Sequence, residues 1–252
     1  MRLLLEEQDC FSNMAEDAAL MECKSEGTLR LYTWNPKAVS IGYFQAIDEV
    51  VDLNFCIENN INVVRRMTGG GAVFHDKELT YSMIWPMNDW IELAGRGGKD
   101  VNSTMDTYKI ICACVIAGLG ELGISATFKP INDIETNGKK ISGNAQTKRN
   151  GCLLQHGTIL YGLGGDVMFR ALRICEEKIS DKKIESPSQR VTCVTSEAES
   201  VSFEDLTGAI KNGFERVLGE KLEHGELNEE ERSAKDRLRG EIFTKEWWNH
   251  QR

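Results

Sequence analysis

The sequence predicts an α+β fold with a mixed, largely antiparallel β-sheet flanked by helices. Predicted strands and helices follow one another without strict β–α–β alternation, which favours a mixed sheet. Residues 126–161 alternate in polarity and contain two Asn-Gly turn signals, so they predict three consecutive antiparallel strands. No stretch resembles a long linker between domains. We therefore expect a single domain over residues 1–252, in which 220–252 forms a small helical C-terminal tail.

The elements before residue 100 follow from capping, turn and alternation signals. A helix over 13–24 has Ser12 or Asn13 as its expected N-cap, and Asn35-Pro36 marks a turn. The same signals predict strands at 29–34, 38–42, 61–65, 72–74 and 80–85, and a helix at 49–60. Residues 88–100 are polar and rich in glycine, and we expect a loop there.

The elements after residue 100 begin with the longest predicted helix, 103–122, which Ser103 or Asn102 would cap. The three strands of the antiparallel meander are expected at 127–136, 140–147 and 152–161. Further helices are predicted at 166–175, 203–218 and 229–239.

Composition excludes several classes of protein. The 30 basic and 39 acidic residues give a net charge of −9, which argues against a nucleic-acid binder. No stretch approaches 18 consecutive apolar residues, so we expect no membrane span. The start of the chain has too short an apolar run for a secretory signal. The eight cysteines are irregularly spaced, which favours buried thiols in a reducing, cytoplasmic setting.

The segment RRMTGGGAVFHD at 65–76 is the first candidate for chemistry. Successive glycines Gly69, Gly70 and Gly71 can bring backbone N–H groups close to an anion, because no Cβ blocks the approach. Arg65 and Arg66 add positive charge that can bind phosphate or carboxylate. A plain turn between strands explains the glycines alone. The further presence of Thr68, His75 and Asp76 favours a binding site.

A second group of candidates lies on the predicted meander. Asn132 and Asp133 suit a divalent ion or a ribose hydroxyl, or equally a solvated strand face. In a strand, Lys140, Ser142 and Asn144 share one polar face, and Gly143 allows a ligand to approach closely.

Cys152 and His156 share a strand face but lie four residues apart, about 13 Å along a strand. Their side chains would therefore not hydrogen bond directly. A Cys–His nucleophilic pair is not expected from them.

Together these segments resemble the lipoate–protein ligase A family, within the biotin/lipoate ligase superfamily. The resemblance rests on RRMTGGGAVFHD (65–76), NDIETNGKKISGNAQ (132–146) and LLQHGTIL (153–160). SPSQRVTCV (186–194) and NMAEDAAL (13–20) also fit, and the match covers about residues 3–250. The resemblance implies the biotin/lipoate–protein ligase catalytic-domain fold. It also implies ATP- and Mg²⁺-dependent activation of lipoate to lipoyl-AMP. The lipoyl group would pass to a lysine of an apo lipoyl-domain protein, either a 2-oxoacid dehydrogenase E2 or a glycine cleavage H protein.

The resemblance also implies roles for single residues. Lys140 matches the family's lysine at the acyl carboxylate and α-phosphate, and is the expected catalytic group. Asn132 and Asp133 match the nucleotide side, with Asp133 as the candidate Mg²⁺ ligand. The expected substrate- and adenylate-binding set is completed by Arg65, Arg66, Thr68, Gly69, Gly70, Gly71, His75, Ser142, Gly143 and His156. Segments 40–45, 70–74 and 142–145 would line an apolar tunnel for the acyl chain.

Two alternatives stay open. Octanoyltransferases and lipoyl amidotransferases share this fold but use a cysteine thioester and no ATP. In those relatives the cysteine precedes the lysine strand, and residues 125–139 here contain none. A non-catalytic lipoate or adenylate binder is the second alternative. The chain also lacks the family's C-terminal accessory domain, so we expect a split ligase that needs a separate small accessory subunit.

Overall fold

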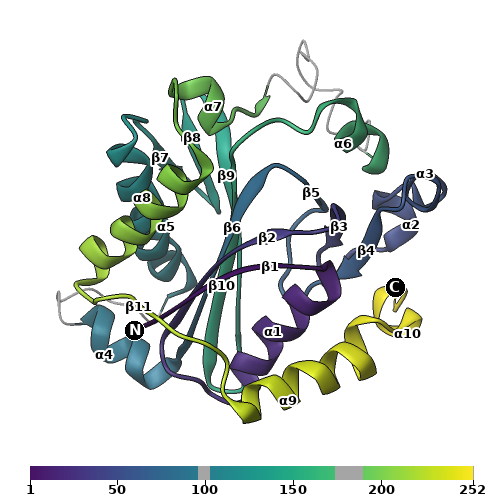
Figure 1. Ribbon diagram of the computed structural model, residues 1–252, viewed down its shortest axis with the longest axis horizontal. Helices are drawn as coiled ribbons and strands as arrows, with labels where there is room; N and C mark the ends of the chain where they lie inside the picture. The colour runs from purple at the N-terminus through teal and green to yellow at the C-terminus, as the bar shows by residue number, and fades with distance from the viewer. Residues whose placement is uncertain (96–102, 174–189, 252) are drawn as a thin grey trace.

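The computed structural model describes residues 1–95, 103–173 and 190–251. They form one large and one small β-sheet with helices around them (Figure 1). The large sheet has the strand order β11-β1-β2-β6-β10-β9-β8-β7, and the small one β4-β3-β5. Pairing is parallel for β11–β1, β1–β2 and β3–β4, and antiparallel for the other pairs. The prediction of a mixed, largely antiparallel sheet is confirmed.

The strands are β1 (Arg2–Gln8), β2 (Thr28–Trp34), β3 (Ala38–Ile41), β4 (Asn62–Arg65), β5 (Val73–His75), β6 (Glu78–Pro86), β7 (Thr127–Lys129), β8 (Asp133–Thr136), β9 (Lys139–Arg149), β10 (Cys152–Leu160) and β11 (Glu223–His224). The helices are α1 (Cys10–Glu22), α2 (Ile47–Val50), α3 (Leu53–Glu58), α4 (Met87–Gly95), α5 (Thr104–Glu121), α6 (Gly165–Ala171), α7 (Val194–Glu197), α8 (Phe203–Leu218), α9 (Glu229–Leu238) and α10 (Glu246–Asn249). A π-helical turn, Arg239–Phe243, joins α9 to the segment before α10.

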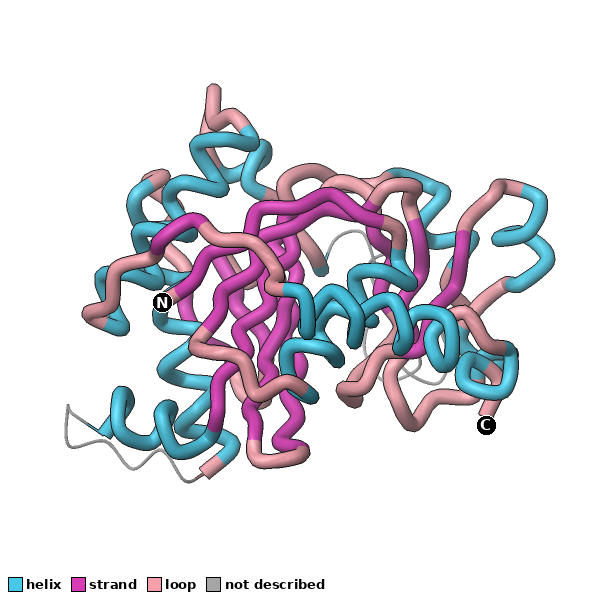
Figure 2. The backbone as a smooth tube through the Cα atoms, turned by 60° about the horizontal axis from the view of Figure 1, so that its bottom comes forward, coloured by secondary structure: helices cyan, strands magenta, loops and turns pink. Residues whose placement is uncertain are grey.

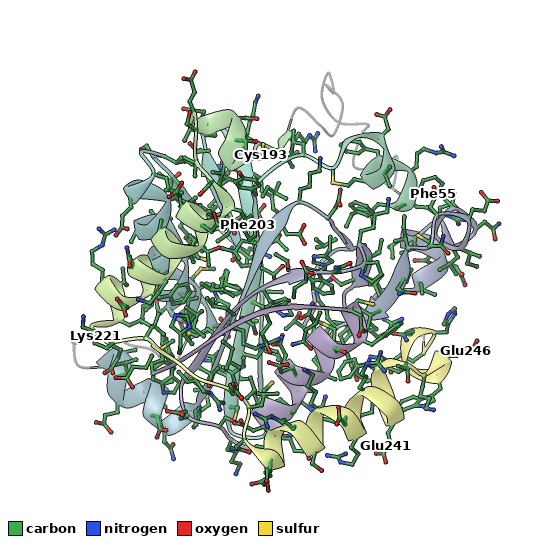
Figure 3. All side chains as sticks on the ribbon, viewed as in Figure 1. Phe55, Cys193, Phe203, Lys221, Glu241 and Glu246 are labelled. Carbon is green, nitrogen blue, oxygen red and sulfur yellow. The ribbon has the colours of Figure 1, made fainter. Side chains whose placement is uncertain are left out.

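Helices α5 and α8 cover one face of the large sheet, as Figure 1 shows on its left side. Their backbones cross closely: a Cβ on Gly213 would lie 2.3 Å from the carbonyl oxygen of Cys114. Only glycine permits that approach. α8 begins at Phe203, labelled in Figure 3, whose ring meets Tyr161 edge-on at 5.3 Å. Along β2, Leu29 and Leu31 point into this main hydrophobic core.

Helices α1 and α9 pack together on the opposite face of the large sheet. Figure 2 follows the chain from α9 to its end, beside the small sheet. Alanines of α1 and Ala234 of α9 allow the two helices to lie close. Trp248 of α10 is buried and donates its indole N–H to the carbonyl of Arg65 at 2.9 Å, while Trp247 is 60% exposed. Residues 229–249 thus pack against both α1 and the small sheet.

Several predicted elements need correction. Residues 87–95 form α4, because Trp90 and Leu93 are buried at helical spacing. The rest of the predicted 88–100 loop, from 96 on, lies outside the described residues. α1 is capped by Asp9, whose carboxylate accepts from the backbone N–H groups of Phe11 and Ser12, so the helix begins earlier than predicted. Strand β1 was not predicted.

Two predicted segments are interrupted. The helix at 49–60 is two short helices, α2 and α3, because Val51 leaves helical geometry and Asp52 caps the second. The strand at 127–136 is the hairpin β7–β8. The turn at Asn137-Gly138 is confirmed, with φ of 50° and 74° at the two residues.

Candidate functional site

A cavity of about 260 Å³ lies between the large and small sheets. Its apolar wall comes from α1, β2, β5, β10 and α6, and includes Met14, Trp34, Phe74, Leu160, Met168 and Leu172. The polar wall includes Ser40, Arg66, His75, Lys140, Asn144 and His156. The cavity can therefore hold an apolar chain with a polar, electron-rich head group at one end.

Lys140 stands at the edge of this cavity on β9. Its ammonium lies 2.7 Å from the carboxylate of Asp133, and its side chain is 40% exposed. A Cβ on Gly143 would lie 2.7 Å from Nζ of Lys140, so the glycine leaves room for this side chain. The segment after residue 190 closes over it, because the backbone N–H of Thr192 donates to the carbonyl of Lys140 at 2.9 Å.

Asn132 and Asn144 brace the β8–β9 side of the cavity. The side-chain amide of Asn144 donates to the carbonyl of Asn132 at 2.9 Å, and the amide of Asn132 donates back to the carbonyl of Asn144 at 2.5 Å. Ser142 is buried and lines the same wall. Both asparagine amides are thus used for structure, which fixes the strand that carries Lys140.

Arg66 is a buried cation on the cavity wall. It donates to the carbonyls of Gly69 and Gly71 at 2.9 and 2.7 Å, and to the hydroxyl of Thr68 at 3.2 Å. No carboxylate of the described residues forms an ion pair with it. Burial lowers the pKa of Arg66 to about 10, which leaves it charged at neutral pH. A positive charge without a carboxylate favours an anion or a developing oxyanion in the cavity.

The glycine loop at 69–71 is shaped by contacts within the protein. Gly70 has a φ of 96°, which disfavours other residues, and its carbonyl lies against Gly42. A Cβ on Gly42 would lie 2.0 Å from that oxygen. Gly70 and Gly71 line the cavity, whereas Gly69 faces the exposed ring of Phe44.

Arg65 has a different role from the predicted one. Its guanidinium is fully buried and donates to the backbone carbonyls of five residues, namely Gly42, Tyr43, Gln45, Trp248 and Asn249. It does not line the cavity. The prediction that Arg65 contacts the substrate is therefore wrong, because its donors join the 42–45 turn to α10.

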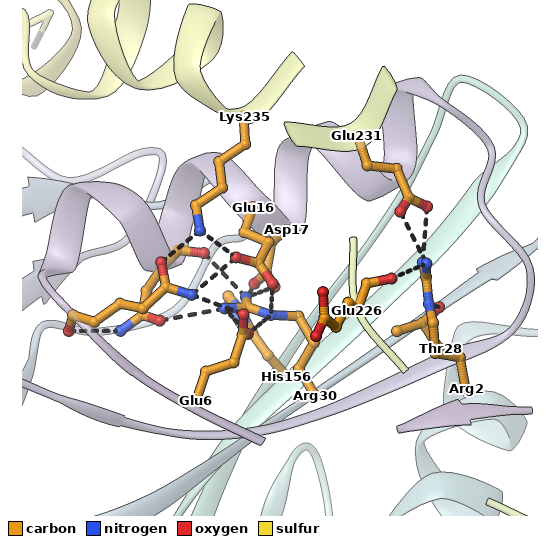
Figure 4. Close-up of polar contacts among 12 residues, drawn as sticks. Arg2, Glu6, Glu16, Asp17, Thr28, Arg30, His156, Glu226, Glu231 and Lys235 are labelled. Carbon is orange, nitrogen blue, oxygen red and sulfur yellow. Dashed lines mark hydrogen bonds and ion pairs between the residues drawn. The ribbon is translucent and has the colours of Figure 1, made fainter. Parts of the chain in front are cut away.

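His156 lies at the end of a buried network of charges, drawn in Figure 4. Its Nε2 is 2.6 Å from the hydroxyl of Thr68, and its Nδ1 is 3.3 Å from the carboxylate of Asp17. Asp17 in turn pairs with the fully buried Arg30 at 2.5 Å. Thr68 is buried and does not line the cavity, so it positions His156 rather than a ligand.

His75 lies on the other side of the cavity. Its Nε2 is 2.8 Å from the hydroxyl of Ser40, and its Nδ1 is 2.6 Å from the carboxylate of Glu78. The ring stacks on Trp34 with centroids 3.7 Å apart. Burial, reinforced by Arg66 and His156 and opposed by Glu78, lowers the pKa of His75. The imidazole is therefore neutral at neutral pH.

The cysteines of the described residues do not line the cavity. Cys152 is buried, its thiol lies 3.4 Å from the carbonyl of Met21, and burial raises its pKa. Cys193 occupies the position before α7, and its thiol lies 3.1 Å from the hydroxyl of Ser196. Cys175 lies outside the described residues.

The predicted Mg²⁺ site finds little support in the described part of the chain. No cluster of three or more His, Cys, Asp or Glu side chains within residues 1–95, 103–173 and 190–251 can hold a metal ion. Asp133 is a single carboxylate that is already paired with Lys140, and it does not line the cavity. The need for ATP and Mg²⁺ stays a prediction.

Sequence reasoning placed Ser40 in the 40–45 segment of the tunnel wall but missed its polar role, and it missed Glu78 and Asp17. Ser40 is the one polar residue in the apolar strand Ala38–Ile41, which was an available signal. Glu78 lies only three residues after His75, and the fold turns its carboxylate onto Nδ1 of that histidine. Asp17 gave no local signal, because it is 139 residues away from His156 in the sequence.

The sequence model of the lipoyl protein ligase A/B catalytic domain matches residues 9–215. The chain belongs to this family. Octanoyltransferase LipM of Kyrpidia tusciae is 34% identical over 93% of both chains, and that of Brevibacillus brevis is 32% identical with the same coverage. A bipartite lipoate protein ligase from Thermoplasma acidophilum superposes with a TM-score of 0.85 at 30% identity, over 99% of this chain and 95% of its own. A lipoate-protein ligase A bound with ATP superposes with a TM-score of 0.84 at 28% identity, over 99% of this chain and 98% of its own.

Family membership confirms the predicted lipoate-ligase catalytic fold and makes the chain an enzyme of the lipoate/biotin ligase superfamily. Its relatives connect it with protein lipoylation. The predicted activity, however, is wrong: the high-coverage curated relatives are octanoyltransferases, which overturns ATP-dependent lipoate ligation. The accessory subunit stays a prediction. No described helix is long and apolar enough to cross a membrane.

Proposed function

We propose that this enzyme transfers an octanoyl group from a thioester carrier to a lysine of a lipoyl-domain protein. The observation that carries the proposal is the 34% identity to an octanoyltransferase over 93% of the chain. The cavity agrees with it, because an apolar wall faces a wall with two cations.

The polar wall supports acyl transfer in a direct way. Attack on a thioester carbonyl places negative charge on the carbonyl oxygen. The ammonium of Lys140, and the guanidinium of Arg66, can stabilise this charge without reorganisation of solvent. The apolar wall would hold the octanoyl chain and so orient the carbonyl. In the net reaction an amide bond forms to the acceptor lysine, the thioester C–S bond breaks, and the carrier thiol leaves with a proton.

An intact-mass assay on an apo lipoyl domain tests the proposal. One tube holds the enzyme with an octanoyl-carrier thioester and no ATP. A second holds octanoate, ATP and Mg²⁺, and a third holds lipoate, ATP and Mg²⁺. We expect octanoylation of the lipoyl domain in the first tube. Modification in the second or third tube, with none in the first, would contradict it.

A further inference from the structure

Ser40 and His75 face the cavity from the small sheet. Strands β3 and β5 are antiparallel with Ala38 opposite His75, so Ser40 lies diagonally across from His75 on the same face. The Ser40 hydroxyl reaches Nε2 of His75 at 2.8 Å. Ser40 lines the cavity although its residue is only 2% exposed. Ser40 therefore lies in the wall of the cavity that the proposed function assigns to the acyl group.

His75 is held in one orientation by three contacts. Glu78 accepts from Nδ1 at 2.6 Å with one carboxylate oxygen, and from the backbone N–H of Asp76 at 2.7 Å with the other. Trp34 stacks on the ring. With Nδ1 protonated towards Glu78, Nε2 is free to accept the hydroxyl proton of Ser40. This is the order of a serine–histidine–carboxylate triad, which is recognised by geometry rather than by sequence.

Arg66 completes the arrangement. Its Nη1 lies 3.2 Å from the Ser40 hydroxyl oxygen, so it favours the anionic form of that oxygen. The second histidine gives no equivalent nucleophile, because its partner Thr68 does not line the cavity. No cysteine of the described residues lines the cavity, so none offers a nucleophile there either.

We propose that Ser40 is the nucleophile that carries the acyl group as an ester during transfer, with His75 as its general base. This rests on the proposed octanoyl transfer. In the first step the Ser40 oxygen attacks the thioester carbonyl, its proton passes to His75, and the C–S bond breaks. His75 then protonates the leaving thiolate.

In the second step the amine of the acceptor lysine attacks the ester carbonyl of octanoyl-Ser40. A proton of that amine passes to His75 and from there to the serine oxygen as the C–O bond breaks. The products are an amide on the lipoyl domain and free Ser40. No oxidant, metal or nucleotide is needed for either step.

The test uses the wild-type enzyme and an octanoyl-carrier thioester without lipoyl domain. We expect the enzyme to gain one octanoyl group, which peptide mapping places on Ser40. The linkage should resist neutral hydroxylamine and be cleaved by alkaline hydroxylamine, as an oxygen ester is. An acyl group on Cys175, Cys193 or any other cysteine, labile to neutral hydroxylamine, would overturn the proposal.

Variants separate this proposal from the proposed function. Ser40→Ala should form no acyl-enzyme and transfer at least about a hundredfold more slowly. Ser40→Cys should still be acylated, with a linkage that neutral hydroxylamine cleaves. Ser82→Ala is the matched control, because Ser82 is a buried serine outside the cavity. Two results would refute the role of Ser40 as nucleophile while leaving octanoyl transfer intact. One is a transfer rate of Ser40→Ala equal to that of the wild type. The other is transfer by the wild type without any detectable acyl-enzyme. If the wild type transfers nothing from the thioester, the proposed function itself fails.

Discussion

Lys140 is the residue on which the proposed chemistry depends most. Its ammonium reaches the cavity from a partly exposed side chain, so its removal leaves the core untouched. We expect Lys140→Ala to slow octanoyl transfer by about a hundredfold or more, the usual cost of losing one group that stabilises an oxyanion. Lys139→Ala is the control, because Lys139 is an exposed neighbour that does not line the cavity. Equal rates for the two variants, measured by intact mass, would remove Lys140 from the mechanism.

Gly143 tests whether the position of Lys140 matters as well as its charge. An added Cβ would collide with the end of the flexible Lys140 side chain, which can move away at little cost in stability. Gly143→Ala should therefore lower the transfer rate about tenfold and change the free energy of unfolding by less than about 1 kcal/mol. Gly120→Ala, where a Cβ meets open space on α5, is the control. An unchanged transfer rate in Gly143→Ala would show that Lys140 needs no fixed position.

Cys152 is the cysteine nearest in sequence to His156, and the structure separates the two. The thiol is buried in a cluster with Leu4, Leu20 and Leu154, and burial raises its pKa. A buried thiol of this kind is a poor nucleophile. Cys152→Ser should keep octanoyl transfer within about threefold of wild type, with a modest loss of stability from the buried hydroxyl. Complete loss of transfer in a folded Cys152→Ser variant would revive a thioester at this position.

At the scale of elements, Arg65 links β4 to α10. Its five carbonyl partners come from the 42–45 turn and from Trp248 and Asn249. Arg65→Met would leave these buried carbonyls without their donor, which costs about 1–3 kcal/mol for each group left unsatisfied. We expect the free energy of unfolding in urea to fall by at least about 3 kcal/mol. Arg232→Met, which removes an exposed ion pair with Glu226, should change it by less than about 1 kcal/mol. Similar values for the two variants would contradict the structural role of Arg65.

The sequence predicted elements well where one local signal dominates. The Asn137-Gly138 turn, the cap at Ser103 and the long helix α5 all have such signals, and all are confirmed. Strand β1 escaped prediction because its three consecutive leucines do not alternate with polar residues and are followed directly by Glu6 and Glu7. In the structure, Arg2 is buried against Glu231, a partner far away in the sequence. Distant partners of this kind cannot be read from a local pattern.

The candidate site was predictable in part for the same reason. Lys140, Gly143, Arg66 and His156 line the cavity, as the motifs suggested. Arg65 does not line the cavity. It is the last residue of β4 and Arg66 follows the strand, so only the packing of α10 decides which arginine faces the cavity. The activity could not be predicted, since the chain is similar both to octanoyltransferases and to a lipoate protein ligase over nearly its whole length.

At the scale of the whole molecule, buried charges connect helix α9 to His156 (Figure 4). Glu16 is fully buried between Arg30 at 3.0 Å and Lys235 of α9 at 2.6 Å. Burial alone would raise the pKa of Glu16. The charges of Arg30 and Lys235 and the hydrogen bond with Glu6 outweigh it and hold the pKa at about 2.

This network predicts a contribution of Glu16 to acid stability. Because its pKa is lower in the folded state, Glu16 stabilises the fold at pH values above about 4.5, and this is lost as the pH falls towards 2. Glu16→Gln should reduce the free energy of unfolding by on the order of 2–3 kcal/mol at pH 7. The difference from wild type should shrink between pH 4.5 and 2. A difference that stays constant with pH would contradict the assigned ion pairs.

The central claim is that this cavity transfers an octanoyl group from a thioester without ATP. The most direct measurement is the rate at which an apo lipoyl domain gains octanoyl mass from an octanoyl-carrier thioester in nucleotide-free buffer, with wild-type enzyme and Lys140→Ala side by side. The account predicts fast octanoylation by the wild type and at least about a hundredfold slower octanoylation by the variant. No octanoylation by the wild type until ATP, Mg²⁺ and a free acid are added would contradict it.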